Sequence, residues 1–356
     1  MTGPEHVPVP LGTDAELNRA HLQKLLDSAP GGTLLLPAGT YPLAHGLTVP
    51  AGWTVRGAPP GPIPTGTIPA GPVTWLTVET PGDRPVLHVV GSGVSILDLG
   101  LRPAPSRPGE HDGDRGTGLT VGRYLYPDAP EWIDGIEVRR VHVDHGTNRA
   151  ANAVAVMGAV RDTTVADVTV TGGHTGVAVH WGAIGAGVDT IVGPSYHPHR
   201  LRLSGLRVRD AVEGFYLSAV HDVEVAGACL RGVDMGFRLL AGDNTDRFHR
   251  DPQARICERI EIRDACVTWT GPLYGVRVAG WGRSEVDGLV SRVEYVDTTI
   301  RDTVLRRLPD KPAATTGTAR RGWSPVLMEH ADTVVLDDVR LTSTPPAPPC
   351  CPLSTP

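Results

Sequence analysis

A short recurring phrase constrains the fold of this chain more than any other feature. Each copy begins with a glycine and continues with alternating apolar residues, and the copies start at Gly176, Gly214, Gly236 and Gly275. A second apolar phrase alternates with the first, at residues 165–170, 203–208, 225–230, 262–267 and 336–341. Short β-type elements that recur about every two dozen residues are typical of a solenoid. Each coil of a solenoid buries its apolar face only when the next coil stacks on it.

The composition favours an all-β class. The chain contains 43 glycines and 33 prolines, its aromatic content is only 5%, and valine-rich runs of period two recur along it. We therefore predict a single-stranded right-handed parallel β-helix, in which the handedness follows from the strong bias of parallel crossover connections.

Residues 13–16, Thr-Asp-Ala-Glu, form a capping box that predicts an amphipathic helix over residues 13–29. The apolar face of this helix is expected to cover the open first coil, as terminal caps of solenoids do. The predicted organisation is a flexible N-terminus (1–12), one β-helix domain (13–341) that includes this capping helix, and a disordered Pro-rich tail (342–356).

Residues 31–43 (GGTLLLPAGTYPL) and 47–58 (LTVPAGWTVRGA) resemble the opening of the pectin lyase-like, right-handed parallel β-helix proteins. The resemblance implies the same fold along nearly the whole chain. It does not select one activity, because the superfamily includes polysaccharide lyases, glycosidases, epimerases, phage tail proteins and biosynthetic cyclases.

The charge of the chain and its cysteines limit the kinds of partner and the cellular compartment that we expect for this protein. The net charge is −6, the only lysines are Lys24 and Lys311, and no basic stripe is present, so nucleic acid is not an expected partner. No secretion signal or membrane-spanning run is apparent, so we expect a cytoplasmic protein without a membrane partner. The five cysteines are expected to stay reduced, including Cys229 and Cys266, which occupy the same position of successive coils.

The coils that start at Gly176 and Gly236 are much longer than the coil that starts at Gly214. The extra residues follow the glycine-led strand directly, which predicts two loops, 181–199 and 242–255, that wall a cleft. Because side chains alternate along a strand, the cleft floor should present two outward columns. These columns contain Ala155, Ala178, Tyr216, Arg238 and Arg277, and Met157, His180, Ser218, Leu240 and Ala279.

His180, Tyr216 and Arg238 are the predicted catalytic residues. An imidazole titrates near neutrality, a phenol can donate a proton, and a guanidinium can hold a carboxylate or enolate. The predicted substrate-binding residues are Met157, Trp181, His197, His199, Leu240, Asp243, Arg277 and Trp281. His197 and His199 with His180 form an alternative three-nitrogen metal site, but we predict no metal and no other cofactor.

The floor columns contain no carboxylate pair of the kind that a glycosidase needs, and no acidic cluster for calcium is evident. The content of Ala, Arg, Gly, Pro and Val is typical of actinobacterial proteins, some of which resemble β-helix enzymes of natural-product biosynthesis. The primary prediction is therefore an intracellular cyclase, isomerase or lyase acting on a small molecule of secondary metabolism, such as a polyketide. The alternatives are a carbohydrate lyase, epimerase or glycosidase, and a non-catalytic binding or structural β-helix. The oligomeric state is left open.

Overall fold

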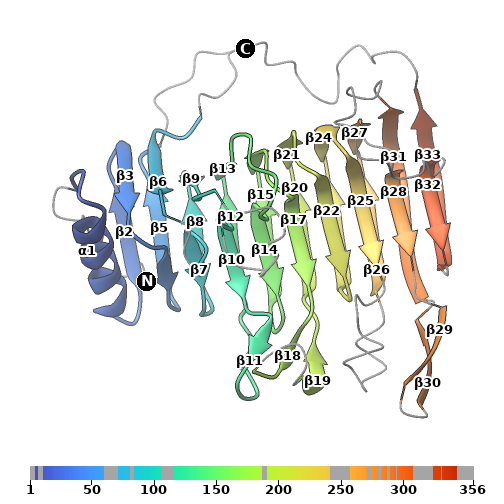
Figure 1. The fold of residues 1–356 in the computed structure, drawn as a ribbon, viewed down its shortest axis with the longest axis horizontal. Coiled ribbons are helices and arrows are strands. Elements are labelled where there is room, and N and C mark those ends of the chain that lie inside the picture. Colours follow the sequence, from blue (N-terminus) through green and yellow to red (C-terminus); the bar gives the residue numbers. More distant parts are fainter. Residues whose placement is uncertain are drawn as a thin grey trace.

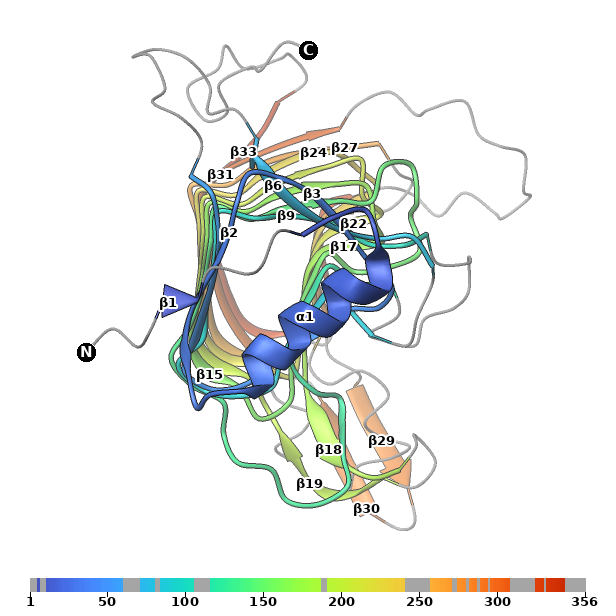
Figure 2. The ribbon, with the colours of Figure 1, turned by 90° about the vertical axis from the view of Figure 1, so that its left-hand side faces the viewer.

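The structure is a computed structural model that describes residues 5–6, 11–59, 71–80, 84–105, 116–186, 191–240, 257–270, 274–279, 282–286, 289–293, 295–307, 324–329 and 331–342. Successive coils lie side by side along one axis (Figure 1). Each complete coil contributes one strand to each of three faces, and the view along the axis shows these faces surrounding a common interior (Figure 2).

Face 1 consists of β2 (Gly32–Leu36), β5 (Trp53–Gly57), β8 (Ser95–Leu97), β12 (Ile136–Arg139), β15 (Arg161–Ala166), β20 (His199–Ser204), β23 (His221–Ala226), β26 (Cys257–Arg263) and the first parts of β31 (Tyr295–Arg307) and β33 (Asp332–Leu341). Face 2 consists of β3 (Gly39–Leu43), β6 (Thr74–Val78), β9 (Gly100–Arg102), β13 (His142–Asp144), β16 (Thr169–Thr171), β21 (Arg207–Arg209), β24 (Cys229–Val233), β27 (Cys266–Trp269) and the last parts of β31 and β33. Face 3 consists of β4 (Leu47–Val49), β7 (Leu87–Val89), β10 (Leu119–Gly122), β14 (Val154–Met157), β17 (Thr175–His180), β22 (Glu213–Ser218), β25 (Met235–Leu240), β28 (Tyr274–Ala279) and β32 (Ser324–Glu329).

Strands of successive coils pair in parallel and in register. The glycine-led strands β17 and β22 align Val177 with Phe215, and β22 and β25 align Phe215 with Phe237. Parallel pairing between coils, a connection through two further faces and a helix at the N-terminus confirm the predicted right-handed parallel β-helix. They also agree with the resemblance to pectin lyase-like proteins.

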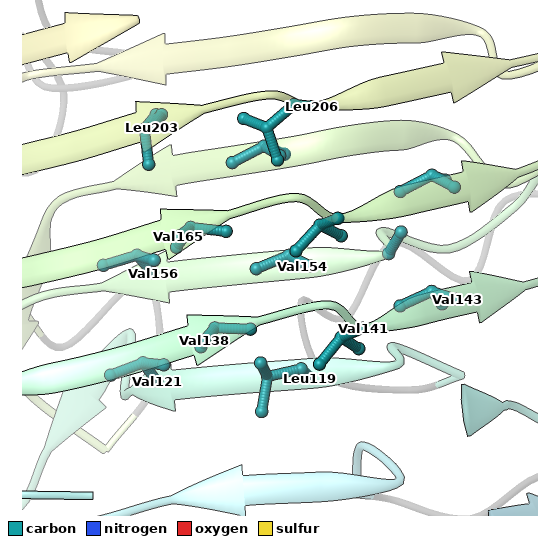
Figure 3. Close-up of a cluster of buried hydrophobic side chains, with 14 of the residues drawn as sticks. Leu119, Val121, Val138, Val141, Val143, Val154, Val156, Val165, Leu203 and Leu206 are labelled. Carbon is teal, nitrogen blue, oxygen red and sulfur yellow. The ribbon is translucent and has the colours of Figure 1, made fainter. Parts of the chain in front are cut away.

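The interior is a stack of aliphatic side chains from all three faces (Figure 3). On face 1, Val138 is in register with Val165, and Val165 with Leu203, and all three are buried. Each coil therefore extends one continuous core.

The leading glycines of face 3 are required by the close approach of neighbouring coils. A Cβ on Gly176 would lie 2.7 Å from the carbonyl oxygen of Gly214, and one on Gly236 would lie 2.3 Å from the carbonyl oxygen of Gly275. Any side chain at these positions would push two coils apart. The repeated glycine is thus a packing requirement of the stack.

A left-handed residue marks the turn from face 1 to face 2 in most coils. These residues have positive φ and occupy equivalent positions: Asp98, Arg140, Asp167, Gly205, Gly227, Asp264, Asp302 and Asp338. Glycine adopts this conformation without strain, and aspartate tolerates it better than most residues. The second apolar phrase of the sequence is the pair of short strands on either side of this residue.

The helix α1 (Ala15–Asp27) lies across the N-terminal end of the solenoid (Figure 2). Leu22 and Leu26 are fully buried in the main core, which confirms the capping role. The residue that caps the helix is Asp14 and not Thr13, because the Asp14 side chain accepts a hydrogen bond from the backbone N–H of Leu17. Residues 5–6 form β1 (Glu5–His6), which pairs with β2, although the sequence predicts a loose segment there.

Insertions gather where face 3 leads to face 1. β11 (Leu125–Tyr126), β18 (Gly182–Ile184), β19 (Val192–Tyr196), β29 (Gly282–Val286) and β30 (Leu289–Val293) all follow strands of face 3 and project from the same edge of the solenoid (Figures 1 and 2). The predicted loop 181–199 contains β18 and β19, which pair antiparallel. The predicted loop 242–255 lies outside the described residues.

Two further findings concern the membrane and the thiols. Within the described ranges, no helix is long and apolar enough to span a membrane. Cys229 is disulfide-bonded, so the prediction that all five cysteines are reduced is wrong for this residue. Cys266, which is in register with Cys229, is a reduced thiol, as predicted. Cys257 is a free thiol that is completely buried, and burial raises its pKa to about 12.

Candidate functional site

The two outward columns of face 3 are aligned in space as the strand alternation predicts. One runs in register through Ala155, Ala178, Tyr216, Arg238 and Arg277, and the other runs through Met157, His180, Ser218, Leu240 and Ala279. Three of these side chains are the predicted catalytic residues: His180, Tyr216 and Arg238. They come from three successive coils.

The predicted open floor is largely covered. Tyr216 is 9% exposed and Leu240 3%, and Ala178, Tyr216, Leu240 and Ala279 form an apolar cluster of their own. Met157 is buried as well, at the end of β14. The floor differs from the sequence-based expectation because these outward-facing side chains pack against one another across coils, whereas Arg238 and Arg277 stay partly exposed.

His180, Tyr216 and Arg238 form a continuous series of contacts. The ring centroid of His180 lies 5.9 Å from that of Tyr216, and the guanidinium carbon of Arg238 lies 4.9 Å above the Tyr216 ring. The latter is a cation–π contact, which holds the guanidinium over the phenol. The tertiary structure therefore brings the three predicted catalytic residues together.

The tautomer of His180 follows from its hydrogen bond. Its Nδ1 lies 2.7 Å from the carbonyl oxygen of Trp181, and a carbonyl oxygen can only accept. Nδ1 therefore carries the proton, and Nε2 is the basic nitrogen of the neutral ring. The rings of Tyr124 and Trp181 lie 5.1 Å and 4.9 Å from the imidazole and orient it.

Glu213 is a site residue that the sequence analysis missed. Its carboxylate accepts a hydrogen bond from Arg238 Nη1 at 3.1 Å and another from the Thr175 hydroxyl at 3.5 Å. The side chain of Glu213 is only 6% exposed. The sequence feature that could have identified Glu213 is its position directly before a leading glycine. The other coils have Thr175, Met235 and Tyr274 at this position, and none of these carries a charge. A buried carboxylate at this position fixes the direction of the Arg238 side chain.

Arg277 lies on the same column one coil beyond Arg238. It donates two hydrogen bonds to Glu329, at 2.9 Å and 3.1 Å, and both side chains are partly exposed. Asp243 and Trp281, two of the predicted substrate-binding residues, lie outside the described residues.

Trp181 does not form the exposed wall that the sequence suggested. Its side chain is fully buried and packs with Ala183 and Ala219, and Tyr124 lies against this cluster. The indole anchors the insertion to the solenoid, because the chain turns away from face 3 at this residue and needs an apolar contact to hold it.

His197 and His199 lie at the edge where the insertion returns to face 1. His197 Nδ1 contacts Nε2 of His221 at 2.8 Å, whereas the His199 ring packs against Trp132 at 4.9 Å. The two imidazoles therefore have different surroundings. Across the described ranges, no three His, Cys, Asp or Glu side chains are arranged to hold a metal ion, so the alternative metal site with His180 is not formed there.

Comparisons with known proteins give only distant similarities. No protein-family model matches the chain, and no curated protein matches it. The A-module of mannuronan C-5 epimerase AlgE4 from Azotobacter vinelandii is 13% identical with a TM-score of 0.36, and the match covers 95% of this chain and 96% of that one.

A tailspike protein from Acinetobacter baumannii bacteriophage Fri1, described as a capsular polysaccharide depolymerase, is 11% identical with a TM-score of 0.48. That match covers 94% of this chain and 55% of the tailspike chain. An α-1,3-glucanase from Streptomyces thermodiastaticus is 11% identical with a TM-score of 0.42, with coverage of 94% and 67%. Similarities this low carry no information about activity.

Proposed function

We propose that this protein is a carbohydrate-active enzyme that abstracts a proton from an acidic sugar, as a lyase or an epimerase does. The observation that carries the proposal is the series His180, Tyr216 and Arg238, with Glu213 holding Arg238 in place. A proton next to a sugar carboxylate can be removed when a cation stabilises the enolate that forms. Arg238 supplies that cation.

His180 and Tyr216 divide the proton transfers in this proposal. Nε2 of His180 takes the proton from carbon in this proposal, since Nδ1 is hydrogen-bonded to the Trp181 carbonyl oxygen. The Tyr216 hydroxyl is the proton donor to the leaving oxygen in an elimination, or to the opposite face of the enolate carbon in an epimerisation. Neither route requires a nucleophile.

The polar character of the site favours this function over the small-molecule cyclisation that the sequence analysis put first. A cyclase cleft for an apolar substrate needs apolar walls, whereas this face carries the ion pairs Arg238–Glu213 and Arg277–Glu329. Trp181, the main apolar wall expected for cyclisation, is fully buried and packs with Ala183 and Ala219.

Hydrolysis by a carboxylate pair is not supported by these residues. Glu213 and Glu329 belong to β22 and β32, which are three strand spacings apart, or roughly 14 Å. The two carboxylates of a glycosidase lie about 5–10 Å apart. Each carboxylate is also bound to an arginine.

The test is a screen of acidic oligosaccharides with two readouts. Elimination creates a conjugated double bond that absorbs ultraviolet light, and epimerisation exchanges the carbon-bound proton with deuterium from heavy water. On a substrate that responds, His180→Gln and Tyr216→Phe should each lower turnover about a hundredfold or more. Arg238→Gln should lower turnover by a similar factor, because the enolate then lacks its stabilising cation.

His88→Gln and Tyr274→Phe are matched controls, because both residues lie on face 3 outside the site. They should retain turnover within about twofold of the unmodified protein. Equal losses in the controls and in the site variants, with all proteins folded, would rule out this assignment of the site.

A further inference from the structure

A second group of reactive side chains lies at the edge between the insertion and face 1, apart from the residues of the proposed function. It consists of Ser195 on β19, His197 directly after β19, His221 at the start of β23 and Glu258 near the start of β26. The insertion supplies the serine and the first histidine. The solenoid wall supplies the other two residues, and His221 and Glu258 are in register.

The four side chains are connected end to end. Ser195 Oγ lies 2.8 Å from His197 Nε2, and His197 Nδ1 lies 2.8 Å from His221 Nε2. His221 Nδ1 lies 3.4 Å from a carboxylate oxygen of Glu258. Ser195 and His197 are two residues apart on an extended segment, so they point to the same side.

One arrangement of protons satisfies the two hydrogen bonds of the series. The Ser195 hydroxyl donates to His197 Nε2, and His197 Nδ1–H donates to His221 Nε2. The third contact, between His221 Nδ1 and the Glu258 carboxylate, has the distance of an ion pair and not the geometry of a hydrogen bond. Burial lowers the pKa of His221, although Glu258 partly opposes this effect, and the lower pKa favours the neutral ring that can accept at Nε2. The stacked rings of His197 and His221, 5.1 Å apart, hold the two imidazoles parallel.

Accessibility is lowest at His197. Ser195 is partly exposed and the His197 side chain is buried, whereas the side chains of His221 and Glu258 are 15% and 24% exposed. Glu258 is further fixed by an ion pair with Arg259, which also binds Asp222. A partly exposed serine, a buried base that its hydroxyl contacts and an anchored carboxylate are parts of an activated serine nucleophile.

We propose that Ser195 is the nucleophile of an ester-hydrolysing site, with His197 as its general base and His221 and Glu258 as positioning residues. Ser195 Oγ bonds to the acyl carbon of a carboxylic ester while its proton passes to His197 Nε2. The bond from the acyl carbon to the alcohol oxygen then breaks, and the alcohol leaves with that proton. Water, deprotonated by His197, cleaves the acyl-serine ester, which releases the carboxylic acid and restores Ser195.

The primary test labels the unmodified protein with a fluorophosphonate, which reacts with activated serines, and locates the label by mass spectrometry. We expect the label on Ser195 and hydrolysis of p-nitrophenyl acetate at a rate at least a hundredfold above that of Ser195→Ala. Ser204→Ala is the matched control, because Ser204 lies on β20 outside the series and should retain both labelling and hydrolysis.

The positioning role is tested through Glu258. Glu258→Gln should lower kcat about tenfold or more with little change in KM, and Glu258→Asp should recover part of the loss. The proposal is overturned if the wild-type protein takes no label, or takes it on another serine. It is also overturned if Ser195→Ala hydrolyses the ester as fast as the wild type. Labelling needs no variant, so a folding defect in one of them does not obscure the result.

Discussion

His145 is a buried imidazole close to face 2, and it makes stability depend on pH. Burial lowers its pKa to about 4, and only the backbone of Asn152 and the charge of Asp144 oppose this effect. The ring is thus neutral in the folded protein, whereas in the unfolded chain it is protonated below its ordinary pKa of about 6.5. The stability that the neutral His145 ring contributes to the folded protein is fully present above about pH 6.5, and it is lost as the pH falls from about 6.5 to about 4.

We expect this single group to remove about 3 kcal/mol from the free energy of unfolding over that interval. His145→Gln should reduce the loss by most of that amount. Urea unfolding of both proteins at the two ends of the interval measures the difference. His21→Gln, on the exposed side of α1, is the matched control, and equal slopes in all three proteins would contradict the assignment.

Asp98 combines a buried charge with a left-handed backbone. Its side chain is 2% exposed and accepts hydrogen bonds from Arg140 at 2.5 Å and Arg56 at 3.1 Å. Burial alone would raise the pKa of Asp98, but the hydrogen bonds and charges of the two arginines bring it below its ordinary value. Its stabilising contribution is therefore present above about pH 4 and is lost as the pH falls through the lowered pKa.

Two substitutions separate the charge of Asp98 from its backbone conformation, since its φ is 57°. Asp98→Asn keeps a residue that tolerates this conformation and should cost about 2 kcal/mol for the lost charged hydrogen bonds. Asp98→Ala should cost about 1 kcal/mol more, for the backbone. Asp264→Asn, at the equivalent exposed turn, should change the free energy of unfolding by less than about 0.5 kcal/mol. Equal effects at both turns would contradict the role of burial.

At the scale of elements, the insertion that contains β18 and β19 depends on one indole. Trp181 is completely buried, and no side chain of smaller volume could fill the space between Ala183, Ala219 and Tyr124. Trp181→Ala should lower the free energy of unfolding by about 3–5 kcal/mol, because it leaves a cavity. Chemical denaturation measures this, and Leu17→Ala, at a position 60% exposed, should be nearly neutral.

The same substitution links the two candidate sites to the fold. Trp181 supplies the carbonyl oxygen that orients His180, and the insertion it anchors carries Ser195 and His197. Loss of activity in Trp181→Ala therefore reports loss of structure. A variant with full stability and no activity would instead place the indole in contact with substrate.

At the scale of the whole molecule, the disulfide at Cys229 conflicts with the compartment expected from the sequence. A cytoplasmic location remains the prediction from the sequence, but stable disulfides are typical of oxidising compartments. Of the five cysteines, one disulfide leaves three thiols. Titration of the denatured, unreduced protein should therefore count three, whereas five would restore the original prediction.

The native protein should react differently from the denatured one. The pKa of Cys257 is about 12 and its side chain is inaccessible, so it should not react with a thiol reagent until the solenoid unfolds. Mass spectrometry of the alkylated native protein checks this. Alkylation of Cys257 at the rate of an exposed thiol would mean that the coils open readily at β26.

The amino-acid sequence by itself determined the architecture, because successive coils repeat the same short sequence patterns. The leading glycines, the alternation of apolar residues from Val177 onward and the capping helix can each be recognised from a short stretch of sequence. A stack of coils is the arrangement that buries the apolar faces of all the repeats. Strand alternation also placed His180, Tyr216 and Arg238 on one face, since that inference needs only the period of a strand.

Only the tertiary structure decided which side chains meet across coils and which become buried. Glu213 reaches Arg238 from the neighbouring coil, and Trp181 is fully buried in a cluster with Ala183 and Ala219. His197 contacts His221, a residue of face 1 that lies outside the two columns predicted for the cleft floor. Contacts of this kind depend on how an irregular insertion folds back on the solenoid, and an insertion has no period from which its path can be predicted.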